Sequence, residues 1–179
     1  MRIISGIFKS KRITAPKKLP VRPTTDMAKE ALFNILNNSY YFDEISVLDL
    51  FAGTGNISYE FGSRGCKQLT CVDANYGCIK FISKTSEELE LNISAIKSDV
   101  FSFLEKTSLK SNIIFADPPY AISLEDFSKI PALVFKNDLL SDGGVLIIEH
   151  AKETDLSNLM HYSKQKKYGS SIFSFFEKE

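Results

Sequence analysis

Short apolar runs alternate with amphipathic stretches along the chain, and this alternation is typical of an α/β fold. Between the runs, apolar residues recur at helical spacing. The pattern therefore predicts an open α/β sheet whose strands are connected by helices. The runs that have the length of buried parallel strands lie at residues 47–50, 68–72, 93–96, 112–116 and 145–149.

Both ends of the chain carry further structural signals. A helix is predicted from Asp26, because Thr24 and Thr25 can cap it and the apolar residues that follow recur on one face. Near the other end, Gly169 divides residues 162–176 into two extended segments, which predicts a C-terminal hairpin. Together these signals add one helix before the first parallel strand and two strands after the last.

A turn with two glycines follows the strand at 47–50. It reads Phe51-Ala52-Gly53-Thr54-Gly55, and a helix pattern opens at Asn56. Glycines let the backbone turn sharply and approach a ligand without a Cβ in the way. Strand, turn and helix therefore predict a ligand site at the carboxyl end of the strand. Asp49 lies inside the apolar run and needs a hydrogen-bonded partner, which we expect to be a ligand or a capping amide.

The residues around this turn narrow the choice of ligand. The dinucleotide fingerprint G-x-G-x-x-G is incomplete, because Ser58 stands in place of the third glycine. The pattern D-x-F-x-G-x-G instead resembles the first motif of S-adenosylmethionine (SAM) methyltransferases. The next strand stops at Asp73, twenty positions after Gly53, where an acid can accept from both ribose hydroxyls. That arrangement suits NAD and SAM equally, so it predicts a nucleoside ligand without saying which.

The most specific motif follows the strand at 112–116 and reads Asp117-Pro118-Pro119-Tyr120. Two prolines after a strand can be simple punctuation. Given the usual frequency of each residue type, however, this four-letter match arises by chance in roughly one chain in a thousand. It also falls at the carboxyl end of a strand, on the same edge as the glycine turn and Asp73. The placement favours a functional motif.

The four residue types suit methylation of an exocyclic amino group on a nucleobase. Such an amine is a poor nucleophile, because its lone pair is delocalised into the ring. The Asp117 carboxylate and the Pro118 carbonyl can each accept one N–H and localise that lone pair. Pro118 and Pro119 fix φ and remove backbone donors. Tyr120 offers a face on which an extruded base can stack.

The charge of the chain is unevenly placed. Seven of the 22 basic residues and none of the 22 acidic residues lie in residues 1–25. A basic arm on an acidic body suggests a polyanionic partner, although a solvated face or a structural cover remains open. Segments 2–7 and 11–15 can pair as a hairpin across residues 8–10. We expect residues 1–23 to form an extension that binds such a partner, which the family resemblance below implies is RNA, with contacts from Arg2, Lys9, Lys11, Arg12 and Arg22.

Three segments in order, MRIISGIFKSKRI, RPTTDMAKEALFNIL and DLFAGTGNISYEFGSRG, resemble the bacterial 16S rRNA guanine-N2 methyltransferase family. The resemblance covers essentially the whole chain. It implies that residues 24–179 form a Rossmann-like SAM methyltransferase domain, with seven strands in the order 3-2-1-4-5-7-6 and the last strand antiparallel. It further implies that Asp99 accepts from the adenine amino group while the Val100 amide meets the ring. Asp99 has an alternative role as a helix cap.

The resulting prediction is an enzyme that transfers a methyl group from SAM to guanine N2 in small-subunit rRNA. The expected partner is the RNA or an assembling small-subunit particle, and the expected state is a monomer. The expected catalytic residues are those of the Asp117–Tyr120 motif. The expected SAM contacts are Asp49, Phe51, Gly53, Gly55, Asn56, Asp73, Ala74, Asp99 and Val100.

Two other functions remain open from the residues alone. A DNA adenine or cytosine amino-methyltransferase shares the D-P-P-Y chemistry, although such enzymes usually carry a separate target-recognition region. A nicotinamide oxidoreductase is disfavoured by Ser58 and by the D-P-P-Y motif. Composition adds bounds: three cysteines without C-x-x-C spacing and two histidines predict no metal site, and without an apolar run near eighteen residues or a signal-peptide pattern we expect a cytoplasmic protein.

The strand at 145–149 ends on Glu149 and His150, which reach the same edge of the sheet. We interpret the two as a pair on the rim of the site. A short helical piece is predicted over residues 155–160, before the C-terminal hairpin.

Overall fold

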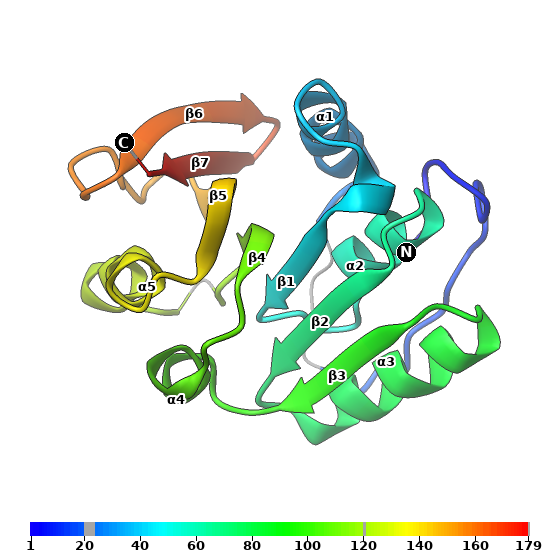
Figure 1. Ribbon diagram of the computed structural model, residues 1–179. Helices are drawn as coiled ribbons and strands as arrows, with labels where there is room; N and C mark the ends of the chain where they lie inside the picture. The colour runs from blue at the N-terminus through cyan, green and yellow to red at the C-terminus, as the bar shows by residue number, and fades with distance from the viewer. Residues whose placement is uncertain (20–23, 120, 179) are drawn as a thin grey trace.

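A computed structural model describes residues 1–19, 24–119 and 121–178, and its centre is a single seven-stranded sheet (Figure 1). The strand order is β3-β2-β1-β4-β5-β7-β6, as the resemblance implied. The strands are β1 (Ser46–Leu50), β2 (Gln68–Asp73), β3 (Ile93–Lys97), β4 (Ser111–Ala116), β5 (Leu140–Ala151), β6 (Tyr162–Tyr168) and β7 (Ser171–Glu177). The helices are α1 (Asp26–Leu36), η1 (Phe42–Glu44, one 3-10 turn), α2 (Asn56–Ser63), α3 (Tyr76–Glu88), α4 (Val100–Lys106) and α5 (Leu124–Lys136).

Strands β1 to β5 are parallel, so their carboxyl ends share one edge of the sheet. Strand β7 is antiparallel to β5 on one side and to β6 on the other. The predicted antiparallel last strand is therefore confirmed. The parallel register places the glycine turn after β1 beside the turn after β4, since Leu50 pairs with Ala116.

Alternating side chains of the strands feed two hydrophobic layers. Val47 and Ile113 face the layer that α1 and α2 cover, and Leu48 and Ile114 face the layer that α4 and α5 cover. A strand covered on both faces must be apolar on both faces, which is why these segments read as unbroken apolar runs. Within the described residues, no helix combines the length and the apolar character needed to cross a bilayer.

The N-terminal arm (residues 1–23, of which 1–19 are described) packs on α2 and α3. Ile3 and Ile13 are buried in one cluster with Tyr59 and Leu89. The predicted hairpin is present only as a short pairing, not as two regular strands over residues 2–7 and 11–15. Arg2 and Arg12 form an isolated antiparallel bridge. Backbone hydrogen bonds on either side of it join Met1 to Ile13 and Ile3 to Lys11.

Beyond Ile3, the backbone donors of the arm bond to α2. The amides of Ile4 and Ser5 donate to the Glu60 carboxylate over 2.8 and 3.0 Å, and the Ile7 amide donates to the Ser63 carbonyl over 2.8 Å. These bonds attach the arm to α2 at the point where its pairing with residues 11–13 ends. Gly6 is required here, since a Cβ on it would meet the Ser63 carbonyl oxygen at 1.8 Å.

In the carboxyl-terminal half, the helical piece expected at residues 155–160 is absent, and a glycine pair lies inside a strand. Residues 155–160 form turns in place of the predicted helical piece. The Asp142-Gly143-Gly144 segment lies inside β5, where the register with β4 shifts between Ser111 and Ile113. Gly143 has a φ of +67°, which an irregularity of this kind accommodates most easily with glycine.

Candidate active site

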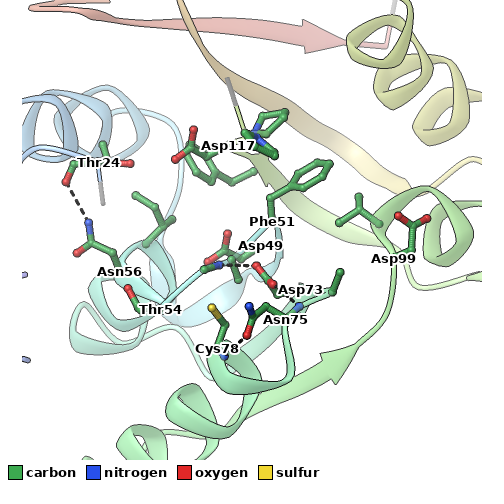
Figure 2. Close-up of a pocket in the computed structure, with 18 residues that line it drawn as sticks. Thr24, Asp49, Phe51, Thr54, Asn56, Asp73, Asn75, Cys78, Asp99 and Asp117 are labelled. Carbon is green, nitrogen blue, oxygen red and sulfur yellow. Dashed lines mark hydrogen bonds between the residues drawn. The ribbon is translucent and has the colours of Figure 1, made fainter. Parts of the chain in front are cut away.

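A cavity of about 500 Å³ opens at the carboxyl ends of β1, β2 and β4 (Figure 2). Most of the residues predicted for the site line it, although they come from four separate segments of the chain. Gly55 is not among the lining residues, and Tyr120 and Arg22 lie outside the described residues. The predicted residues that line the cavity are Asp49, Phe51, Gly53, Asn56, Asp73, Ala74, Asp99, Val100, Asp117, Pro118 and Pro119.

The turn after β1 holds three residues in the left-handed region. Phe51, Gly53 and Gly55 have φ angles of +56°, +54° and +82°. Gly55 caps α2, and a Cβ on it would meet the Tyr59 ring at 2.9 Å. Its contribution is therefore to let the turn close against α2, while Phe51 adopts a conformation that is uncommon for a bulky residue and lines the cavity.

Asp73 is fixed by two backbone donors (Figure 2). One carboxylate oxygen accepts from the Gly53 amide and the other from the Asn75 amide, each over 2.8 Å. The first bond ties the end of β2 to the glycine turn across twenty residues. Each oxygen keeps further lone-pair capacity, so the carboxylate can accept from a ligand while its position is held.

Asp49 has the hydrogen-bonded partner that its burial requires. The Ser58 hydroxyl donates to the Asp49 carboxylate over 2.6 Å. Burial raises the pKa of Asp49 to about 7, the Ser58 hydrogen bond opposes this rise and the negative charge of Asp73 adds to it. Ser58, which breaks the dinucleotide fingerprint, therefore supports the acid of β1.

Asp99 serves as a helix cap and also borders the cavity. Its side chain accepts from the Ser102 amide over 2.9 Å at the start of α4. The residue is otherwise exposed, so one carboxylate oxygen remains accessible at the cavity rim. Nearby, the Phe51 and Phe101 rings meet edge to face with centroids 6.1 Å apart.

Asp117 follows β4 and points into the cavity, with Pro118 buried and Pro119 exposed beyond it. Its pKa lies well above the ordinary value, first because of burial and then because of the negative charges of Glu149 and Asp49. A carboxyl with these neighbours is sensitive to any added donor or positive charge.

A second cavity of about 210 Å³ shares Asp117 and Pro118 with the first and reaches Glu149 and His150. The rim interpretation of the last two is wrong, since their exposed fractions are 7% and 5%. The Thr24 and Ser171 hydroxyls donate to the two Glu149 oxygens, each over 2.7 Å.

His150 is accounted for by its immediate neighbours. One ring nitrogen lies 2.9 Å from the Ala151 carbonyl and the other 2.8 Å from the Ser174 hydroxyl, which suits a neutral imidazole that donates to the first and accepts from the second. Burial also lowers the pKa of His150.

Asn56 connects the cavity to the N-terminal arm. Its amide nitrogen donates to the Thr24 carbonyl over 3.1 Å (Figure 2), and its oxygen accepts from the fully buried Lys29 ammonium over 2.9 Å. Lys29 also lies 3.4 Å from Glu60, the residue that holds the amides of the arm. Sequence reasoning missed Thr24, Lys29 and Glu60 as parts of this network.

The sheet order, the glycine turn, the acid at the end of β2 and the D-P-P turn after β4 together define the class, a SAM-dependent methyltransferase fold. Comparison with known proteins then gives the family. The model of the family described as conserved hypothetical protein 95 matches residues 1–177. Ribosomal RNA small subunit methyltransferase D from Buchnera aphidicola (subsp. Baizongia pistaciae) is 32% identical over 161 residues, which cover 89% of this chain and 80% of that protein.

Solved structures agree. The protein yhhF from Escherichia coli superposes with a TM-score of 0.87 at 26% identity, over 100% of this chain and 98% of that one. The Thermus thermophilus 16S rRNA N2 G1207 methyltransferase, solved with AdoMet and guanosine, gives 0.71 at 20% identity over 90% of this chain and 45% of that one, which speaks for the fold alone. The chain belongs to the 16S rRNA guanine-N2 methyltransferase family that its sequence resembles.

Proposed function

We propose that this chain transfers the methyl group of SAM to the N2 amino group of a guanine in 16S rRNA. One observation carries the proposal: the D-P-P turn after β4 lines the same cavity as the glycine turn and Asp73. A site for a nucleoside cofactor and a site for an aromatic amine therefore adjoin each other. The family of the chain supports small-subunit rRNA as the polymer.

The cavity suits SAM in size and in charge. Its volume falls within the usual range for small-molecule sites, and Asp49, Asp73 and Asp117 give it an acidic lining. When bound, SAM supplies an activated methyl group on a positively charged sulfonium. In our proposal Asp73 accepts from the ribose hydroxyls, Asp99 accepts from the adenine amino group and the Val100 amide faces the ring. Phe51, Asn56 and Ala74 complete the lining.

The D-P-P turn prepares the nucleophile. The Asp117 carboxylate and the Pro118 carbonyl each accept one N–H of the guanine amino group, which localises its lone pair toward the methyl donor. Asp117 acts in its ionised form, so its raised pKa places the acid limb of activity at higher pH than an ordinary carboxyl would. Pro119 restricts the turn, and Tyr120 is proposed to stack on the base.

The N-terminal arm is proposed to hold the RNA. Arg2, Lys9, Lys11 and Arg12 are exposed on a segment that Ile3 and Ile13 anchor to the domain. Arg22 is proposed as a further contact, and Arg2 pairs with Asp26 at 3.0 Å. Since the arm contributes to the core, point substitution of Lys9, Lys11 and Arg12 tests RNA binding better than deletion. We further propose that the protein acts as a monomer in the cytoplasm, on rRNA or on an assembling small-subunit particle.

Labelled methyl transfer tests the proposed activity. The purified chain is incubated with methyl-labelled SAM and, separately, with 16S rRNA, with partly assembled small-subunit particles, with genomic DNA or with no polymer. We expect label in rRNA or in the particle and none in DNA. Label in DNA would favour the amino-methyltransferase of DNA, and absence of label from every polymer would contradict the proposal.

A further inference from the structure

Strand β6 carries two lysines, Lys166 and Lys167, near the edge of the sheet where the parallel strands have their carboxyl ends. We call this edge the catalytic edge. Register across β7 places Lys166 level with Glu149, through Phe173, and Lys167 level with His150, through Ile172. Two strand spacings of about 4.8 Å separate the backbones of β6 and β5. The backbones of Lys166 and Lys167 therefore lie about 10 Å to the side of the smaller cavity that Asp117, Glu149 and His150 line, which we call the acceptor cavity. Because successive side chains of a strand alternate, the two lysines extend from opposite faces of this edge strand.

These two lysines differ from the lysines at the opposite edge of the sheet. There, Lys110 and Lys178 both pair with Asp138. Lys166 and Lys167 are exposed, and neither has a carboxylate oxygen within 4 Å among the residues that the structure describes. The charges of Lys166 and Lys167 are thus left available to a partner, whereas those of Lys110 and Lys178 are compensated within the fold.

The position of β6 complements the N-terminal arm. Figure 1 shows the arm on the α2 and α3 side of the molecule and β6 at the other end of the sheet, with the β1 and β4 ends between them. A strand of RNA whose target base enters the central cavity extends in both directions from it. A cationic surface on each side of the cavity matches the charge of such a strand.

We propose that Lys166 and Lys167 bind backbone phosphates of the RNA on the side of the acceptor cavity opposite the N-terminal arm. This inference rests on the proposed function for the identity of the polymer. Lysines on an edge strand also discourage edge-to-edge pairing of sheets, and a negatively charged side chain would serve that role as well as a lysine. Phosphate binding needs positive charge, so the two roles separate by experiment.

The test compares three double variants with the wild-type chain. Lys166→Gln/Lys167→Gln removes both charges, and Lys166→Glu/Lys167→Glu keeps a charged edge of the opposite sign. The matched control is Lys106→Gln/Lys136→Gln, two exposed lysines at the last residues of α4 and α5 that also have no ion pair within the described residues. The dissociation constant for a 16S rRNA fragment is measured over a range of salt concentrations, and SAM affinity is measured separately.

The glutamine pair should flatten the log–log salt slope by about 1.4, at about 0.7 per phosphate of single-stranded RNA, and weaken RNA binding roughly 10- to 30-fold at about 0.1 M salt. The glutamate pair should lose more RNA affinity than the glutamine pair. SAM affinity should stay at the wild-type value in every variant, and the control variant should bind RNA as tightly as wild type. Wild-type slope and affinity in both β6 variants would overturn the proposal and leave edge protection as the role of these lysines. Wild-type chain that binds RNA without methylating it would refute the proposed function, yet the slopes would still decide the role of β6.

Discussion

The site has a cofactor half, around Asp49 and Asp73, and an acceptor half, around Asp117 and the adjoining cavity of Glu149. The two halves are built in different ways. On the cofactor side, each acid is held by a neighbour along the chain or by the adjacent strand: Asp73 by Gly53 and Asn75, and Asp49 by Ser58. On the acceptor side, Glu149 beside Asp117 is held by Thr24, which is 125 positions away in sequence. The cofactor side is local and the acceptor side is assembled by the whole fold.

The halves also differ in what holds their charge. Asp73 accepts from two backbone amides, which hold its carboxylate in place. No such donor pair faces Asp117 within the described residues, and burial together with Glu149 and Asp49 raises its pKa. Asp73 is thus positioned to accept hydrogen bonds from a ligand, whereas Asp117 is a carboxyl whose protonation state a bound amine can change. A substitution in one half should therefore leave the properties of the other half measurable.

The largest effect is expected from Asp117→Ala. Loss of the acceptor for the amine should lower kcat by about 100- to 10,000-fold, the usual range for a positioned proton-accepting group. SAM affinity, measured by calorimetry, should stay within a few-fold of wild type. Glu125→Ala, an exposed acid on α5, is the control. Turnover of the Asp117 variant close to wild type would mean that the D-P-P turn is structural only.

Asp73→Ala should impair the cofactor half of the site. Removal of a charged acceptor for two hydroxyls is expected to weaken SAM binding by about 2–3 kcal/mol. Glu87→Ala, which removes an exposed acid from α3, should leave SAM affinity unchanged. Calorimetry gives both values, and a thermal melt of the apo variant shows whether loss of the Gly53 and Asn75 bonds has unfolded the turn. Unchanged SAM affinity in a folded Asp73 variant would remove this residue from the cofactor site.

Asp49 makes the stability of the domain depend on pH. Because its pKa is about 7 in the folded chain, against 3.8 as its ordinary value, the folded state holds the proton longer than the unfolded state. Ionisation therefore costs stability, and this contribution is lost as pH rises from about 4 to about 7. Between about pH 5 and pH 8, wild type should lose about 2–3 kcal/mol more than Asp49→Asn. Urea unfolding of both proteins at the two pH values measures this difference in the free energy of unfolding. Parallel pH dependences of the two proteins would contradict the raised pKa of Asp49.

The smallest effect concerns the contact between the two carboxyls on the acceptor side. Glu149→Gln removes one negative charge that raises the pKa of Asp117. The acid limb of the kcat/KM profile should move to lower pH, since Asp117 then ionises more readily. Glu153→Gln, an exposed acid of the same small cavity, should leave the limb in place. A shift in the control as large as in the Glu149 variant would point to a general charge effect.

The contrast between the halves also explains what the sequence could predict. The order of the strands came from the family resemblance. The strands and the cofactor side were accessible, because the apolar runs, the glycine turn and Asp73 are contiguous signals, and the carboxyl ends of parallel strands share one edge of a sheet. The capping role of Asp99 was accessible for the same reason, since a cap is a local feature. The network of Lys29, Glu60 and Asn56 could not be predicted, because helical periodicity does not indicate which polar residue will be buried against another segment.

Glu149 and the N-terminal arm show the same limit. A glutamate at the end of a strand is usually exposed, and only the Thr24 and Ser171 hydroxyls make its burial tolerable. In the arm, alternating residues suggested a longer hairpin, but the pairing ends after Ile3 and the Ile4 and Ser5 amides donate to Glu60. Long-range polar partners overrode the local pattern in both places.

The identity of the modified nucleoside tests the central claim most directly. 16S rRNA methylated by the wild-type chain is digested to nucleosides and analysed by mass spectrometry against methylated standards, with the Asp117→Ala variant as the blank. We expect N2-methylguanosine in the wild-type digest and its loss in the variant. N6-methyladenosine in the wild-type digest, or N2-methylguanosine formed equally by the variant, would contradict the claim that the D-P-P turn presents a guanine amino group to SAM.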